Sequence, residues 1–336
     1  MEKTMALKVA INGTGRIGLI VAKIIVARDD IELVAMNTTS KMDMLLYLLK
    51  YDSVHTGVNA VFVDDTTISI NGKHVKIFSE RDPSKVDFGG CGAKVVIECT
   101  GKFLTLESCQ GHLKNGVEKV IMSAPAKDDT PTFVYQINSN IYKGEPIVSN
   151  ASCTTNCLAP ICKVLDDAFG IENGLMTTIH SYTNDQNILD VKHSSDNRRA
   201  RAAALNMIPT TTGAAKAISK VLPHLSGKLN GYAMRVPTAD VSVVDLTVNL
   251  KQEVTKELIN DAMKKASLST FAGLLEIDED QRVSSDFIGS SYSATFVPDM
   301  TSVVDKKCVK VLAWYDNEWG YSSRLVDMTL FIGNYK

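Results

Sequence analysis

One cysteine lies in a setting that suits covalent chemistry. Cys153 belongs to the small, polar run SNASCTTN (residues 149–156), which leads into a predicted helix over 154–169. A thiol at a helix N-terminus is close to unpaired N–H groups and to the positive end of the helix, and both favour the thiolate. The same N–H groups can receive an oxyanion when the thiolate attacks a carbonyl. The sequence therefore predicts Cys153 to be a nucleophile.

The cysteine pattern does not predict a metal site. Cys153 and Cys157 could form a ligand pair, but no further Cys/His pair lies at zinc-site spacing. The chain has seven cysteines without a CxxC pair: Cys91, Cys99, Cys109, Cys153, Cys157, Cys162 and Cys308. An odd count without framework spacing indicates reduced thiols.

His180 is the candidate base. It ends a strand-like run and opens the polar loop SYTND (181–185). A histidine titrates near neutral pH and can take a proton from a thiol or from its adduct. By itself such a histidine is more often a surface or capping residue, so its prediction depends on the other groups around it.

Two further stretches suit phosphate. Thr210-Thr211-Thr212-Gly213 precedes a strong helix start at 214–218, and a hydroxyl-rich helix N-terminus binds anions. Arginines in RRAR (198–201) and at Arg235 add cations whose planar guanidinium groups match phosphate oxygens. Basic clusters are usually solvated surface, so these are candidates only.

A glycine-rich loop predicts nucleotide binding. Gly13, Gly15 and Gly18 form a GxGxxG motif that follows an apolar strand and opens a helix. Such glycines allow a tight turn, close approach of the backbone to a pyrophosphate, and close packing of helix on strand. The helix N-terminus supplies N–H groups to the phosphates.

The acid that usually follows the second strand of such a motif is missing. Thr38 occupies its place, in the run NTTSK (37–41). A carboxylate there would hold the ribose hydroxyls, whereas hydroxyls and a cation suit a 2′-phosphate. Alternatively, a Thr or Ser of this loop simply caps the helix that begins at Met42. The cofactor remains open between NAD and NADP.

The elements that carry these residues alternate in the first third of the chain. We expect strands at 7–12, 31–37, 94–99 and 119–123, and helices at 17–27, 42–50 and near 106–113. Short connections between alternating elements favour a parallel sheet covered by helices. Residues 58–78 alternate like antiparallel strands, with Asn71-Gly72 as a hairpin turn. The expected fold class is α/β: a Rossmann-type, doubly wound, mostly parallel sheet.

The second half predicts a different architecture. After the helix at 154–169, strands are expected at 175–182, 231–236, 241–250 and 309–315, and a final helix at 320–335. We therefore expect a dinucleotide-binding domain over 1–151 and an α+β catalytic domain over 152–319. The helix at 320–336 is expected to pack back on the first domain.

Composition narrows the class of protein. The chain has 336 residues with 36 Lys+Arg against 38 Asp+Glu, so a nucleic-acid or membrane-surface protein is not predicted. The N-terminus has no apolar signal core, and the apolar stretch 17–26 is interrupted by Lys23. We expect a cytoplasmic protein with a small-molecule substrate, without a nucleic-acid or membrane partner.

Six motifs, in order along the chain, resemble the phosphorylating glyceraldehyde-3-phosphate dehydrogenase family. They are INGTGRIG (11–18), SNASCTTNCLAP (149–160), TIHSYTNDQ (178–186), PTTTGAAKA (209–217), RVPT (235–238) and WYDNEWGYS (314–322). The resemblance implies an oxidoreductase of glycolysis and gluconeogenesis. Such an enzyme converts glyceraldehyde 3-phosphate, phosphate and NAD(P) to 1,3-bisphosphoglycerate through a cysteine thioester. It also implies a homotetramer.

The same resemblance implies a role for each matched residue. Cys153 would be the nucleophile and His180 the base. The substrate phosphate and inorganic phosphate would be held by Ser152, Thr154, Thr183, Arg199, Thr212, Gly213 and Arg235. Arg198 is an alternative to Arg199. Besides the glycine motif and Thr38, the cofactor would contact Arg16, Ile17, Arg81, Ser123 and Asn317.

Two rival functions remain. A sister enzyme with the same chemistry, such as an erythrose-4-phosphate dehydrogenase, would share these motifs; two anion sites favour a phosphorylated substrate together with phosphate. A nucleotide-binding protein without catalysis, such as one that binds RNA, is disfavoured by intact Cys153 and His180 and by the balanced charge.

Overall fold

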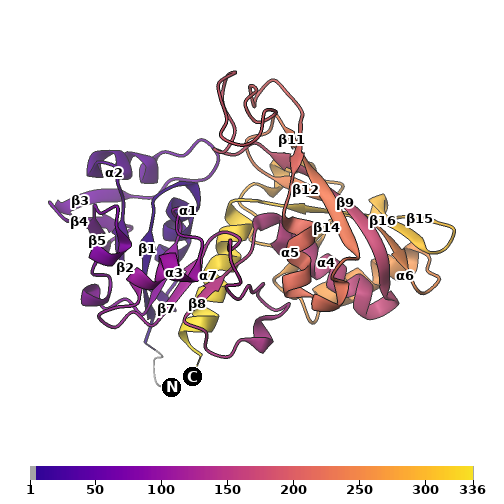
Figure 1. Ribbon diagram of the computed structural model, residues 1–336, viewed down its shortest axis with the longest axis horizontal. Coiled ribbons are helices and arrows are strands. Elements are labelled where there is room, and N and C mark those ends of the chain that lie inside the picture. The colour runs from indigo at the N-terminus through magenta and orange to yellow at the C-terminus, as the bar shows by residue number, and fades with distance from the viewer. Residues whose placement is uncertain (1–4, 336) are drawn as a thin grey trace. The chain divides into compact units, whose positions relative to one another are not determined.

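The computed structural model describes residues 5–335, which form two compact units (Figure 1). The first contains the described residues up to Ser152 together with those from Ser322 onward, and the second contains Cys153–Tyr321. Residues 1–4 and Lys336, which the expected domain boundaries include, lie outside the described residues. Among the described residues, no helix has both the length and the apolar character needed to cross a bilayer.

The first unit is built on one sheet with strand order β3-β4-β5-β2-β1-β6-β7-β8. Its strands are β1 (Leu7–Asn12), β2 (Ile31–Asn37), β3 (Ala60–Asp64), β4 (Thr67–Ile70), β5 (Lys73–Phe78), β6 (Val95–Glu98), β7 (Lys119–Met122) and β8 (Ile147–Ser149). The neighbouring strands β5, β2, β1, β6, β7 and β8 are all parallel to one another. By contrast, β4 pairs antiparallel with both β3 and β5. The predicted mostly parallel sheet is confirmed.

The connections of this sheet explain where a ligand can bind. The helices between its strands are α1 (Arg16–Val26), α2 (Met42–Lys50) and the short α3 (Leu106–Cys109). The chain runs from β1 outward to β2 and returns to the other side of β1 at β6. The carboxyl ends of β1 and β6 therefore form a topological switch point, the usual ligand position in such sheets.

The hairpin between β4 and β5 has the predicted turn. Asn71 and Gly72 have φ values of 48° and 83°, and β4 and β5 pair antiparallel on either side of them. Positive φ at both central residues matches the right-handed twist of the strands, which is why Asn-Gly is favoured there.

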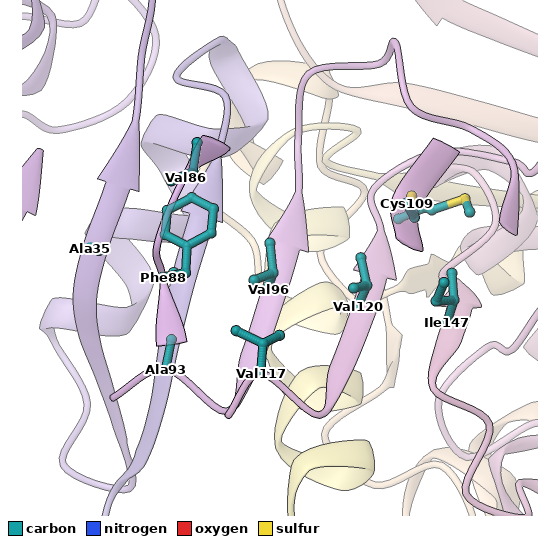
Figure 2. Close-up of a cluster of buried hydrophobic side chains, with 11 residues drawn as sticks. Ala35, Val86, Phe88, Ala93, Val96, Cys109, Val117, Val120 and Ile147 are labelled. Atoms are coloured by element: carbon teal, nitrogen blue, oxygen red, sulfur yellow. The ribbon is translucent and has the colours of Figure 1, made fainter. Parts of the chain in front are cut away.

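A buried apolar cluster fixes one side of this sheet (Figure 2). Val96, Val120 and Ile147 come from β6, β7 and β8, while Phe88 and Val117 come from the connections before β6 and β7. Each such side chain stabilises the fold by roughly 1.5–3 kcal/mol when it is fully buried. This packing holds the parallel strands, and hence their carboxyl ends, in register.

The second unit has a mixed sheet with the order β10-β11-β9-β12-β16-β14-β13, and β15 pairs with β16. Its strands are β9 (Ile171–Ser181), β10 (Ile208–Thr211), β11 (Leu229–Val236), β12 (Ser242–Leu250), β13 (Leu275–Ile277), β14 (Ala294–Phe296), β15 (Ser302–Val304) and β16 (Cys308–Tyr315). Its helices are α4 (Cys153–Phe169), α5 (Ala214–Val221) and α6 (Lys256–Ser267). Helix α4 packs on β9, β12, β14 and β16, and α5 packs on β11.

The last helix, α7 (Trp319–Gly333), enters the first unit at Ser322. The Phe331 ring lies 6.2 Å from the Tyr135 ring and 6.1 Å from the Tyr142 ring. At Gly333, an added Cβ would come within 2.4 Å of a Leu7 methyl carbon. A larger residue here would have to displace the Leu7 side chain, so glycine favours the close approach of the helix to β1.

Two predicted boundaries were wrong. Strand β9 begins at Ile171 rather than at 175, because residues 171–174 pair with β12 and β11. Gly174 weakens the strand pattern, yet a Cβ there would lie 2.7 Å from the Thr247 carbonyl oxygen. The helix expected near 106–113 ends at Cys109 and continues as a 3-10 turn to His112.

Candidate active site

Cys153 is the first residue of α4, at the point where the chain leaves the first unit. The buried Ala151, two residues earlier, has φ of 55°, a conformation that residues with a side chain seldom adopt. Strain of this kind persists where the surrounding structure requires it and is concentrated at functional sites. The turn brings the chain from β8 into α4 with Cys153 at the helix N-terminus.

His180 and Arg235 reach Cys153 through strand register. Strands β9 and β11 are parallel neighbours that place Arg235 opposite His180. The His180 Nε2 atom lies 3.5 Å from the Cys153 Sγ atom. The structure therefore brings together the predicted nucleophile and the predicted base, which are 27 positions apart in the chain.

The Ser181 carbonyl oxygen favours the tautomer of His180 with a proton on Nδ1, while the Arg235 guanidinium competes for the same nitrogen. The oxygen accepts a hydrogen bond from His180 Nδ1 at 2.7 Å and another from Arg235 Nη1 at 3.0 Å. With the proton on Nδ1, the lone pair of Nε2 faces the sulfur. Arg235 Nη1 is only 2.6 Å from Nδ1, so a positively charged imidazole would be repelled.

Burial and the positive charge of Arg235 lower the pKa of His180 to about 3. The imidazole is therefore neutral at pH 7 and able to accept a proton. Burial raises the pKa of the Cys153 thiol, and this effect outweighs the lowering by Arg235 and by hydrogen bonds of the first helical turn. The N–H groups of the first helical turn lower the pKa of Cys153 in the expected direction, but desolvation is the larger effect.

Tyr315 is a neighbour of this pair that sequence reasoning missed. Its hydroxyl bonds to Thr154 Oγ1 and to Thr178 Oγ1, each at 2.8 Å, and its ring lies 6.0 Å from the His180 ring. Tyr315 ends β16 within the WYDNEWGYS segment, and that position was the available signal. The Tyr315 hydroxyl thereby connects the first turn of α4 to strand β9.

The other cysteines of α4 have no access to this site. Cys157 is buried and its Sγ lies 3.8 Å from the Ala313 carbonyl oxygen on β16, and Cys162 is buried as well. Burial raises the pKa of both thiols, that of Cys157 well above its usual value. Neither has the exposure of a reactive thiol.

Arg199, rather than Arg198, lies beside the threonine run. Its Nε donates to Thr210 Oγ1 at 3.0 Å, and its guanidinium pairs with Asp185. Arg198 is exposed, and its guanidinium donates to the Pro209 carbonyl oxygen at 3.5 Å. Burial lowers the pKa of Arg235 first, and the positive charge of Arg199 lowers it further. The two arginines are therefore close enough to interact.

The other residues predicted to bind phosphate lie in loops or at helix starts of the second unit, except Ser152, which directly precedes that unit. Gly213 is the N-cap residue of α5, and the Ala214 N–H donates to Thr212 Oγ1 at 3.2 Å. An added Cβ at Gly213 would meet nothing within 4 Å. Thr183 lies in the loop after β9, where its carbonyl accepts the Gln186 N–H at 2.9 Å. Ser152 is the residue before α4, the last of the first unit.

A separate pocket of about 350 Å³ lies in the first unit at the carboxyl ends of β1, β2, β5 and β6. Its lining combines the predicted Gly13, Gly15, Thr38 and Arg81, and Asn37, Thr39 and Ser40 of the run at 37–41, with residues that sequence reasoning missed, namely Asn12, Thr14, Glu80, Cys99, Thr100, Lys102 and Phe103. Most of the missed residues directly follow a strand, which was the available signal. The pocket occupies the switch point.

The glycines of this pocket fit a dinucleotide. An added Cβ at Gly18 would lie 2.0 Å from the Gly13 carbonyl oxygen, so only glycine allows this helix-to-loop contact. A Cβ at Gly15 would meet nothing within 4 Å, which leaves that backbone open to a ligand. The first helical hydrogen bond runs from Leu19 N to Gly15 O, so the N–H groups of Ile17 and Gly18 have no acceptor inside α1.

Thr38 is buried at the end of β2. Its Oγ1 bonds to Thr14 Oγ1 at 2.6 Å and accepts the Ser40 N–H at 3.1 Å. The alternative in which this loop caps α2 is wrong, since the N-cap residue is Lys41 and it makes no side-chain capping bond. The hydroxyl instead joins the second strand to the glycine-rich loop.

Five predicted cofactor residues are absent from the lining of this pocket: Arg16, Ile17, Gly18, Ser123 and Asn317. Arg16 pairs with Asp52 at 3.0 Å, while Lys23 contacts the other oxygen of that carboxylate at 2.8 Å. Ser123 lies just beyond β7, where its N–H donates to the Glu98 carbonyl oxygen at 2.9 Å. Asn317, in the second unit, is buried two residues after β16.

Comparisons with known proteins identify both units. The family profile "Glyceraldehyde 3-phosphate dehydrogenase, NAD binding domain" matches residues 7–106, and the profile "Glyceraldehyde 3-phosphate dehydrogenase, C-terminal domain" matches residues 152–317. Together the two profiles match most of the chain.

Curated proteins are similar over nearly the whole length. Glyceraldehyde-3-phosphate dehydrogenase of Geobacillus stearothermophilus is 51% identical over 333 residues, which cover 98% of this chain and 99% of the relative. The protein of that name from Priestia megaterium is 50% identical, with 98% of each chain covered. The one from Haemophilus influenzae is 46% identical and covers 99% of this chain and 100% of its own.

Proposed function

The chain belongs to the glyceraldehyde-3-phosphate dehydrogenase family, and on this premise we propose that it oxidises D-glyceraldehyde 3-phosphate with inorganic phosphate and a nicotinamide nucleotide, releasing 1,3-bisphosphoglycerate. The observation that carries the proposal is the 3.5 Å approach of His180 Nε2 to Cys153 Sγ beside Arg235. The assay is formation of the reduced nicotinamide from aldehyde, with and without phosphate. The proposal would be overturned if the rate of aldehyde oxidation did not depend on phosphate, or if no oxidation occurred.

In the first step the Cys153 sulfur bonds to the aldehyde carbon. The thiol proton passes through His180 Nε2 to the carbonyl oxygen, which gives a hemithioacetal. This route fits a neutral imidazole, which the low pKa of His180 ensures, next to a protonated thiol. Because the thiol is close to the N–H groups of α4, the developing oxyanion is stabilised there.

His180 then removes the proton from the hemithioacetal oxygen as hydride leaves the carbon, and a thioester remains on Cys153. The bound nicotinamide supplies the hydride acceptor. A phosphate oxygen attacks the thioester carbon, the C–S bond breaks, and the sulfur recovers a proton from His180. The protein contributes position and anion stabilisation.

We assign the substrate phosphate and the inorganic phosphate to arginines and hydroxyls of the second unit and to Ser152, the residue directly before it. Arg235 and Thr183 hold one anion; Arg199, Thr212, Gly213, Ser152 and Thr154 hold the other. The closeness of Arg199 and Arg235 supports this, since two neighbouring cations are stabilised by bound anions. The dinucleotide binds in the first unit, at Gly13, Gly15, Gly18, Thr38 and Arg81, with backbone N–H groups of the first turn of α1 at the pyrophosphate.

For the cofactor choice, we expect measurable activity with NADP. Thr38 places a hydroxyl rather than a carboxylate at the end of β2, and the pocket lining includes the cations Arg81 and Lys102. Thr38→Asp should shift the ratio of specificity constants toward NAD by about tenfold or more, equivalent to ~1.4 kcal/mol, because like charge repels a 2′-phosphate. Steady-state kinetics with both cofactors measures the ratio.

A matched control separates charge from shape. Thr38→Asn has nearly the shape of the aspartate variant without its charge, and it should leave the ratio close to that of the wild type. An enzyme inactive with NADP, or an unchanged ratio in Thr38→Asp, would show that the missing acid does not set the choice.

The protein is proposed to be a homotetramer. The connection between β9 and β10 carries large apolar side chains that are more than half exposed: Ile188, Leu189, Val191, Leu205 and Met207. Exposed apolar groups gathered on one segment mark an interface, here with further copies of the chain. Light scattering should give a mass four times the 36.6 kDa of the chain. The mass of a single chain would contradict this.

A cytoplasmic location is proposed as well. All seven cysteines are unpaired thiols, and four of them are at least partly accessible. Thiols of this kind persist in a reducing compartment, whereas an oxidising one favours disulfides. Fractionation of the native cell, followed by immunodetection, tests this directly.

A further inference from the structure

Asn317 is held by two serine hydroxyls from neighbouring strands. Its Oδ1 accepts a hydrogen bond from Ser181 Oγ at 2.8 Å and another from Ser242 Oγ at 2.6 Å. The exposed fractions of Ser181, Ser242 and Asn317 are 0%, 1% and 6%. Polar groups so deeply buried are kept in one orientation by such bonds.

The direction of these bonds fixes the amide. Ser242 Oγ accepts the Ser181 N–H at 3.1 Å, and its own proton is then donated to Asn317. The two hydroxyls fill both lone pairs of Oδ1. The carboxamide therefore turns its NH₂ group away from the serines, and Nδ2 makes no hydrogen bond within residues 5–335.

The backbone before Ser242 is strained. Val241 is buried and has φ of 65°, which is strongly disfavoured for a β-branched residue. Such strain is retained where the fold needs one particular geometry. Ser242 follows directly as the first residue of β12, opposite Tyr315 of β16, so the turn at Val241 determines where its hydroxyl lies.

We propose that Ser181 and Ser242 are positioning residues that set the polarity of the cofactor contact: they orient Asn317 so that Nδ2 donates to the carbonyl oxygen of the nicotinamide carboxamide. The inference rests on the proposed function and on the contact with the cofactor that the family resemblance implies for Asn317. A reversed Asn317 amide would present oxygen and would select the NH₂ end of the carboxamide. Ser181 also holds His180 through its carbonyl, so one residue orients both the base and the cofactor anchor.

A double-mutant cycle tests this role. The dissociation constant for NAD is measured for the wild type, Ser242→Ala, Asn317→Ala and the double variant. Each single change should weaken binding about 3- to 10-fold, the usual effect of one buried hydrogen bond. The double variant should bind no more weakly than Asn317→Ala alone, because Ser242 acts through Asn317.

The control is Ser293→Ala, the same chemical change at another buried serine of the second unit. Its hydroxyl has no hydrogen-bond partner among the described residues, so NAD binding should be unchanged. Thermal unfolding verifies that each variant folds. If Ser242→Ala does not fold, Ser181→Ala replaces it in the same cycle.

Cofactor analogues give a second readout. Acetylpyridine adenine dinucleotide has a methyl group in place of the carboxamide NH₂ but keeps the carbonyl, so it should bind nearly as well as NAD and lose affinity equally in Ser242→Ala. An additive cycle, or an analogue bound far more weakly than NAD, would overturn this inference. A wild-type protein that neither binds NAD nor oxidises the aldehyde would instead overturn the proposed function.

Discussion

Cys153→Ser should lower kcat/KM for aldehyde oxidation by about 10⁴-fold or more, the scale seen when a covalent nucleophile is removed. A serine hydroxyl at this position stays protonated and is a far weaker nucleophile than sulfur. The variant keeps the position at the start of α4 and its approach to His180, so the loss reports chemistry rather than misfolding. Formation of the reduced nicotinamide measures the loss of activity, and the thermal unfolding midpoint shows whether the variant is folded.

Cys157→Ser is the matched control for this prediction. It changes the same atom one helical turn further on, where the side chain is buried against β16. Turnover should remain near that of the wild type, although burying a hydroxyl there should reduce stability by about 1–3 kcal/mol. A variant pair with the opposite pattern would place the nucleophile at Cys157.

His180→Asn should lower kcat by about 10²–10⁴-fold, the usual contribution of a general base. Asparagine keeps a donor for the Ser181 carbonyl oxygen but has no basic nitrogen facing the sulfur. The loss should therefore appear in turnover, with the KM for aldehyde little changed. Steady-state kinetics at saturating cofactor and phosphate measures the two constants separately.

Arg235→Leu provides the contrast. It deletes a charge-assisted phosphate contact worth about 1.5–3 kcal/mol, so it should raise the KM for the aldehyde about 10- to 100-fold. The structure adds a smaller effect on kcat, since Arg235 Nη1 lies against His180 and its charge lowers the pKa of that imidazole. If the main effects of the two variants were exchanged, the proposed roles would be wrong.

The sequence predicted most of the first unit because its signals are local. The glycine motif marks the β1–α1 turn, and β2 has the predicted bounds of 31–37. The Asn71-Gly72 turn likewise depends on φ values that few other residue pairs adopt. Gly174 concealed the start of β9, because its close approach to β12 is a tertiary requirement.

The sequence predicted which residues belong to the candidate site, but not the distances and contacts between them. His180 and Arg235 are 55 positions apart and meet only through the register of β9 and β11. The contact of Ser181 with Asn317 spans 136 positions, and no local pattern reveals it. The same holds for the pKa of Cys153, since its burial depends on how α4 packs on the sheet.

The most direct test of the thioester mechanism is to trap the acyl-enzyme. The protein is mixed with glyceraldehyde 3-phosphate and oxidised cofactor without phosphate, quenched in acid, digested and examined by fragmenting mass spectrometry. We predict a 3-phosphoglyceroyl group on Cys153 that disappears when phosphate is added before the quench. An adduct on Cys157 or Cys162, or turnover without any adduct, would contradict it.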